Sequence, residues 1–257
     1  KSIRIQGNPS SVHASGREAR KAIEDSRELI AETIGTNAKN IIFTSGATEA
    51  NNLAFECVKN REIFVSSIEH DSILKQNINF NVVPVNSDGV INLELFEKNI
   101  KNTPKGNIFV SIMAVNNETG VIQPIEKISK ICKQYDAIFH VDAVQAVGRL
   151  NISMQDLNLD LMTISSHKIG GPKGIGCLAV NEKIYSILSP VIMGGGQEGG
   201  FRAGTEAVNQ IIGFGIAAKY ARNLDLIKTC SSRNYLEEKI ISIIPDSIII
   251  GRNAPRV

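Results

Sequence analysis

The chain has 257 residues, of which 42% are hydrophobic and 21% charged, and its formal net charge is +2. These values are typical of a soluble globular protein, and so small a charge does not favour a nucleic-acid or membrane partner. The longest apolar runs are far shorter than the roughly 20 residues that span a bilayer. Four separated cysteines form no Cys-x-x-Cys pair, which favours a reducing, cytoplasmic compartment.

In chain order, the hydrophobic pattern predicts strands that alternate with helices. Helices are expected over residues 15–35, 47–60, 93–100, 124–135 and 206–244. Strands are expected over 40–45, 62–67, 107–115, 137–143, 160–166, 174–180 and near 248–250, with a strand and turn over 81–89. This alternation predicts an α/β fold with a mostly parallel sheet covered on both faces. Ligands of such sheets bind at the carboxyl ends of the strands.

Polar residues follow several of the predicted strands. Gly46, Ala47 and Thr48 open a helix, whose free N–H groups could bind an anion or form an ordinary capped turn. His70 follows the next strand and could stack on a ring, move a proton or serve only structure. Asn117, with Asn116 before it, could form a turn or donate from a neutral amide.

Two charged residues stand where their strands should be buried. Asp142 follows an apolar strand, where an unpaired carboxylate is costly. It could cap the next helix or face a cation such as a protonated pyridine nitrogen. Lys168 follows Ser-Ser-His, where desolvation would favour a neutral amine suited to a Schiff base, although it could also extend to a surface ion pair. Lys173, in a Gly-Pro-Lys-Gly turn, is expected to be exposed and to have no catalytic role.

In combination, these residues supply an anion cradle, a stacking histidine, an amide, a carboxylate and a Schiff-base lysine. They are the parts needed to hold pyridoxal 5'-phosphate (PLP). Their combination is more specific than any one of them.

Six motifs in order resemble the cysteine desulfurases, the NifS/IscS-like members of the class-V aminotransferase group. They read "FTSGATEANNLA", "EHDS", "VNNETG", "HVDAVQAVG", "SSHKIGGPKGIG" and "GGGQEGGFRAGTE". The resemblance implies a fold-type-I PLP-dependent transferase that acts as a homodimer. It implies a large PLP-binding domain over residues 1–225 and the start of a largely missing small C-terminal domain over 226–257.

The resemblance also implies a role for each matching residue. Lys168 would form the Schiff base and move the Cα proton, and His70 would stack on the ring and assist. The remaining assignments are Asp142 to the ring nitrogen, Gln145 to the ring hydroxyl, Asn117 to the substrate, Ala47, Thr48, Ser165 and His167 to the phosphate, and Thr205 to the phosphate of the partner subunit.

The implied reaction converts L-cysteine to L-alanine and passes sulfur to an enzyme cysteine as a persulfide. The sulfur would then go to an acceptor or iron–sulfur scaffold protein, for cluster assembly or tRNA thiolation, with no metal in the enzyme's own site. In the family the acceptor cysteine and a carboxylate-binding arginine lie in the small domain, beyond Val257. We therefore expect none of Cys57, Cys132, Cys177 and Cys230 to be the acceptor, because the helix and strand settings of Cys132 and Cys177 offer no exposed thiol.

Alternative readings remain open at this point. The chain could be a selenocysteine lyase, another PLP-dependent lyase or aminotransferase of this fold, or a non-catalytic PLP-binding fragment. A nucleotide site at "GGGQEGG" is disfavoured because no Lys-Ser/Thr pair follows it.

Overall fold

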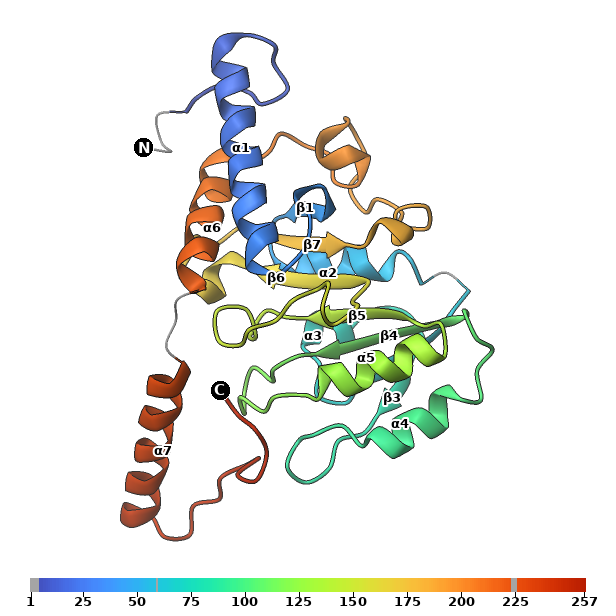
Figure 1. Ribbon diagram of the computed structural model, residues 1–257, viewed down its shortest axis with the longest axis vertical. Coiled ribbons are helices and arrows are strands. Elements are labelled where there is room, and N and C mark those ends of the chain that lie inside the picture. The colour runs from blue at the N-terminus through green and yellow to red at the C-terminus, as the bar shows by residue number, and fades with distance from the viewer. Residues whose placement is uncertain (1–4, 59, 223–225) are drawn as a thin grey trace.

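The computed structural model describes residues 5–58, 60–222 and 226–257. Its centre is a seven-stranded sheet in the order β1-β7-β6-β5-β4-β2-β3 (Figure 1). The strands are β1 (Ile41–Thr44), β2 (Glu62–Ser66), β3 (Asn81–Val83), β4 (Ile108–Met113), β5 (Ile138–Asp142), β6 (Leu161–Ser165) and β7 (Gly176–Val180).

The sheet is mixed but mostly parallel, as predicted. Strands β3, β2, β4, β5 and β6 run parallel, whereas β7 is antiparallel to both β6 and β1. The segment 166–175 that joins β6 to β7 is too short to hold a crossover helix, so the chain reverses there. The turn it makes carries Lys168 and Lys173.

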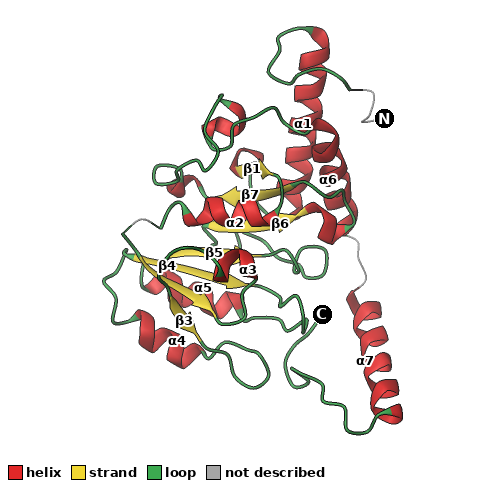
Figure 2. Ribbon diagram, turned by 180° about the vertical axis from the view of Figure 1, so that it is seen from behind, coloured by secondary structure: helices red, strands yellow, loops and turns green. Residues whose placement is uncertain are grey.

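Helices cover both faces and divide the core in two. The helices are α1 (Ala14–Thr33), α2 (Ala47–Phe55), α3 (Asp71–Leu74), α4 (Leu93–Ile100), α5 (Ile125–Gln134), α6 (Val208–Ala221) and α7 (Leu226–Ile243). Apolar residues of α1, α4, α5 and α6 pack into one cluster, and those of α2 and α3 into the other. Figure 1 views the sheet from the side of α1 and α5, and Figure 2 from the side of α2.

Helix α6 packs closely along α1 (Figure 1). A Cβ atom added at Gly215 would lie 2.7 Å from Cβ of Ser26, so glycine is what allows the two helices to approach. Phe214 and Ile211 bury their side chains beside this contact.

Three predicted elements need correction. The helix expected over 47–60 ends at Phe55, because the chain turns to return Cys57 and Val58 to the core. The helical region 206–244 is two helices, α6 and α7. Residues 248–250 form no strand, and Ile248 is 88% exposed because no neighbouring strand pairs with it.

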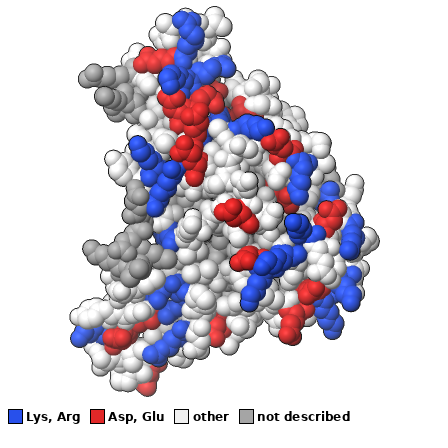
Figure 3. Space-filling model, in the orientation of Figure 1, with Lys and Arg blue, Asp and Glu red and all other residues white. Residues whose placement is uncertain are grey.

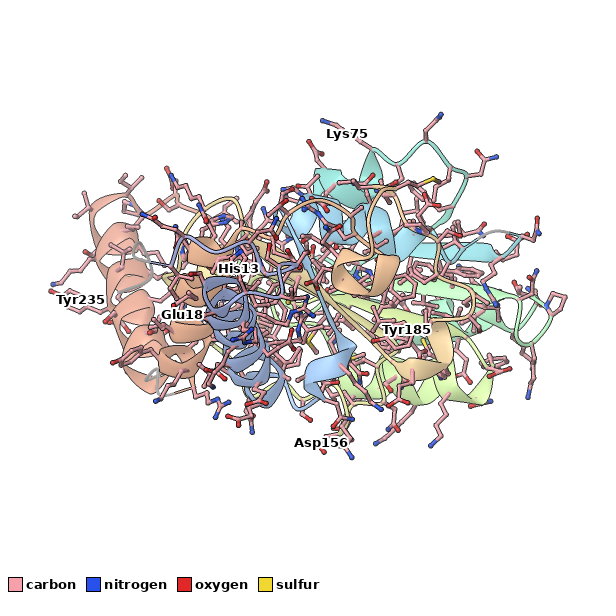
Figure 4. All side chains as sticks on the ribbon, turned by 90° about the horizontal axis from the view of Figure 1, so that it is seen from above. His13, Glu18, Lys75, Asp156, Tyr185 and Tyr235 are labelled. Carbon is pink, nitrogen blue, oxygen red and sulfur yellow. The ribbon has the colours of Figure 1, made fainter. Side chains whose placement is uncertain are left out.

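Helix α7 stands apart from the sheet (Figure 1). Tyr235 points outward from it (Figure 4), and Leu236 and Ile243 are exposed as well. The predicted domain boundary at residue 225 falls in the segment 223–225, outside the described residues. No helix among the described residues combines the length and apolarity needed to cross a membrane.

Candidate active site

A cavity of about 470 Å³ lies at the carboxyl ends of the central strands. Every site residue predicted above lines it except Thr205. The lining includes Gly46, Ala47, Thr48, His70, Ser72, Asn117, Asp142, Gln145, Ser165, His167, Lys168 and Lys173. Residues as far apart as Gly46 and Lys173, separated by 127 positions, therefore meet in one place, as expected for a sheet of parallel strands.

The anion-binding side of the cavity is the N-terminus of α2. The N–H groups of Ala47 and Thr48 lie in its first turn, where no acceptor within the helix exists. A Cβ atom at Gly176 of β7 would lie 2.8 Å from the carbonyl carbon of Gly46, so glycine permits this close approach. Just before the helix, Ser45 N donates to Glu49, which also pairs with Arg202 at 2.9 Å.

Asp142 is the buried carboxylate of the site, with a residue exposure of 6%. Its Oδ1 accepts from Val144 N at 3.0 Å, so it caps a turn after β5 rather than the helix weighed from the sequence, and its Oδ2 accepts from Asn51 Nδ2 at 2.9 Å. Burial raises the pKa of Asp142, and these two hydrogen bonds oppose that rise. A cation facing the carboxylate would favour its ionised form.

His70 has the structural role weighed from the sequence and also faces the cavity. It lines the cavity and also caps α3, because its Nδ1 accepts from Ser72 N at 3.1 Å. Ser72 Oγ lies 2.9 Å from the same nitrogen.

Lys168 differs from the prediction in its burial. It lies in the short 3₁₀ turn Ser166–Ile169 after β6, and its side chain is exposed at the open cavity rather than desolvated. Strand β6 ends at Ser165, three residues before the lysine, so the turn carries Lys168 out of the buried sheet. Lys173 is exposed as predicted, but it lines the same cavity.

Ser165 and His167 complete this side of the cavity. Ser165 is fully buried, and its Oγ lies 2.9 Å from Nδ1 of His167. Desolvation, together with the charges of Lys168 and Lys173, lowers the pKa of His167. The histidine is therefore predominantly neutral at pH 7.

The two asparagines divide the roles that the sequence left open. Asn116 is buried and forms the turn, because its Oδ1 accepts from Glu118 N and from Thr119. Asn117 is exposed at the cavity, as is the half-buried Gln145. Thr205 is exposed and lies outside the cavity.

Two residues beside the site were missed from the sequence. Asn51 of α2 is fully buried and contacts both Asp142 and Ser72. Its position on the apolar face that carries Ala50, Leu53 and Ala54 is a signal, since a polar residue there must find a hydrogen-bond partner.

The other missed residue is Glu69. It is 5% exposed and accepts from Met113 N at 2.7 Å, joining the ends of β2 and β4. Its second carboxylate oxygen, Oε2, is buried without a hydrogen-bond partner among the described residues. Desolvation, and to a lesser degree Asp142, raises the pKa of Glu69 to about 8.

The cysteines lie as expected, away from the cavity lining. Cys57, Cys132 and Cys177 are buried, and burial raises the pKa of each thiol, in Cys57 to about 12. Cys230 is half-buried on α7. On the face seen in Figure 3, positive and negative side chains are interspersed, which agrees with the small net charge.

Comparison with known proteins agrees with this geometry. The aminotransferase class-V family profile matches residues 2–251. A cysteine desulfurase IscS of Buchnera aphidicola is 46% identical over 256 residues, which cover 93% of this chain and 63% of that protein. A mitochondrial cysteine desulfurase of Candida albicans is 46% identical over 229 residues, covering 84% of this chain and 46% of that protein. The chain thus spans less than two thirds of these relatives.

Among solved structures, a NifS-like protein of Rickettsia africae superposes with a TM-score of 0.93 at 39% identity, covering 99% of this chain and 73% of that one. A structure described as SspA in complex with cysteine superposes with a TM-score of 0.76 at 38% identity, covering 84% and 65%. The fold-type-I prediction is confirmed by these superpositions. With its fold, its motifs and a profile match over nearly its whole length, the chain belongs to the aminotransferase class-V family.

Proposed function

We propose that this chain is the PLP-binding part of a cysteine desulfurase, which takes sulfur from L-cysteine and leaves L-alanine. The observation that carries the proposal is the convergence of Lys168, Asp142 and His70 on one cavity beside the N-terminus of α2. The cysteine desulfurase names of the relatives described above support it.

The residues present fit the cofactor. Its phosphate would be held by the N–H groups of Ala47 and Thr48 with the Ser165 and His167 side chains, and its ring nitrogen would face Asp142. Each oxygen of Asp142 accepts one hydrogen bond within the chain, which leaves lone pairs for a cationic N–H group. Gln145 would donate to the ring hydroxyl. When bound, PLP supplies an electron sink for the carbanion at the substrate Cα.

The chain's own side chains handle protons and orientation. The exposed amine of Lys168 would attach the cofactor covalently, then take and return the Cα proton. His70 would stack over the ring and assist that transfer, and Asn117 would orient the substrate. The Cβ–S bond of cysteine is then exchanged for an S–S bond to an enzyme thiolate, and protons complete the methyl group of alanine.

The acceptor thiolate is proposed to lie outside the four cysteines, since three are buried with raised pKa values and none lines the cavity. A mobile loop is needed to bring a thiolate to the sulfur atom of the bound cysteine. Sulfur would pass onward to an acceptor or iron–sulfur scaffold protein. We place the enzyme in the cytoplasm as a homodimer, with Thr205 reaching the phosphate site of the neighbouring subunit.

The test is reconstitution with PLP followed by assay of alanine release from L-cysteine by the full-length protein. Replacement of each of Cys57, Cys132, Cys177 and Cys230 by Ala should leave release within a few fold of wild type. Loss of turnover in any one of these variants, with PLP still bound, would identify that cysteine as the acceptor. A monomer in sedimentation that binds PLP fully would contradict the role of Thr205. Failure to release alanine with PLP bound would refute the proposed activity.

A further inference from the structure

A chain of hydrogen bonds joins the two sides of the cavity beneath its surface. Asn51 Nδ2 donates to Asp142 Oδ2 at 2.9 Å and to Ser72 Oγ at 2.8 Å, and Ser72 Oγ lies 2.9 Å from Nδ1 of His70. One buried amide therefore contacts Asp142 directly and His70 through a single hydroxyl.

The direction of each hydrogen bond follows from its partners. Ionised Asp142 can only accept, so the amide nitrogen of Asn51 must face it, because a flipped amide would place two oxygens together. The second N–H of that amide donates to Ser72 Oγ, which leaves the hydroxyl proton of Ser72 free to be donated to His70 Nδ1. The backbone N–H of Ser72 donates to the same ring nitrogen.

His70 Nδ1 thus accepts two hydrogen bonds. A proton on Nδ1 would break both, so the neutral ring carries its proton on Nε2. Asn51 has little structural reason to be polar, because its own Oδ1 is buried without a partner among the described residues and the amide lies on an apolar helix face.

We propose that Asn51 is a positioning residue that holds Asp142 and, through Ser72, keeps His70 as the tautomer protonated on Nε2. The proposal rests on the function proposed above for this cavity and deepens it, since it joins the residue facing the ring nitrogen to the residue stacked over the ring.

The first measurement uses the chain without cofactor. Long-range ¹H–¹⁵N correlation spectra at alkaline pH identify which nitrogen of the neutral His70 ring is protonated. In the wild type we expect Nδ1 to be unprotonated. In Ser72→Ala the Nδ1 resonance should move toward the protonated position, and Ser72→Thr, which keeps the hydroxyl, should restore it.

The second measurement is the affinity for PLP in Asn51→Leu. We expect about tenfold weaker binding, together with a His70 shift in the same direction as in Ser72→Ala. Asn40→Leu is the matched control, because Asn40 is also buried, donates to a hydroxyl (Thr36 Oγ1, 3.0 Å) and leaves its Oδ1 unpartnered, but lies outside the cavity.

The control should lower stability without changing the His70 resonances or the PLP affinity. A protonated Nδ1 in the wild type, or an Asn51→Leu variant indistinguishable from Asn40→Leu in both measurements, would overturn the proposal. If Asn51→Leu does not fold, the Ser72→Ala and Ser72→Thr pair decides. Because the spectra need neither PLP nor turnover, a chain that fails to release alanine can still show the expected tautomer, so the two proposals fail separately.

Discussion

The guanidinium of Arg27 and the carboxylate of Glu198 form a two-bond ion pair, at 2.8 Å for each bond, between residues 171 positions apart. The carboxylate also accepts from Phe43 N at 2.8 Å, and the Glu198 side chain is only 3% exposed. This pair ties the glycine-rich segment before Thr205 to α1 and β1. The pair therefore fixes the position of this glycine-rich segment relative to α1 and β1.

Glu198→Gln should destabilise the chain by about 3 kcal/mol, because the buried Arg27 guanidinium loses its two-bond partner and keeps, among the described residues, only Glu24, 3.1 Å away and 53% exposed, as an ion-pair partner. Urea unfolding of the chain without cofactor measures this. Asp25→Asn, which removes the exposed pair with Lys21, is the control and should leave stability unchanged within error. Equal effects of the two substitutions would mean that the buried pair contributes no more than a surface pair.

Lys168 should be the residue that binds PLP covalently. Borohydride reduction followed by peptide mass mapping should place the label on Lys168, and Lys168→Ala should abolish it. Lys173 is a demanding control because it lines the same cavity. A label on Lys173, or on no lysine, would refute the assignment.

Asp142→Asn should weaken PLP binding and slow exchange of the substrate Cα proton, because a neutral amide cannot stabilise a protonated ring nitrogen. The loss of one charge-assisted hydrogen bond should cost about 2–3 kcal/mol. Asp156→Asn, at an exposed carboxylate on the rim of the molecule (Figure 4), should leave both quantities unchanged. Unchanged exchange in Asp142→Asn with PLP bound would show that Asp142 only caps its turn.

Glu69→Gln should remove a pH-dependent loss of stability. Burial raises the pKa of Glu69 to about 8 in the folded chain, above its ordinary value of 4.5. The contribution of Glu69 to the free energy of unfolding is therefore fully present below about pH 4.5. It is lost as the pH rises toward 8, with a slope of up to about 1.4 kcal/mol per pH unit.

Glutamine keeps the oxygen that accepts from Met113 N and does not ionise. The difference in unfolding free energy between Glu69→Gln and wild type should thus shift in favour of the variant between pH 5 and pH 9. A difference that is constant over this range would mean that Glu69 is ionised in the folded chain throughout.

The amino-acid sequence by itself determined the sequence of strands and helices, because apolar periodicity is a local property. The predicted helix 93–100 coincides with α4, and the strand cores of β4, β5 and β6 lie within their predicted ranges. It also determined most of the cavity, since parallel strands end at one edge of a sheet and bring together the polar residues that follow them.

The tertiary structure decided what depends on contacts between distant segments. Burial of Glu69 and the link from Asn51 to Asp142, 91 positions away, arise only when α2 packs over β6 and β7, beside the end of β5, and when β2 and β4 pair. The exposure of Lys168 depends on the turn that follows β6, and the anchoring of Glu198 depends on α1. The local sequence pattern assigns a residue to a helix or strand. The hydrogen-bond partners of that residue depend on which elements the fold places beside it, and these partners set its charge and orientation.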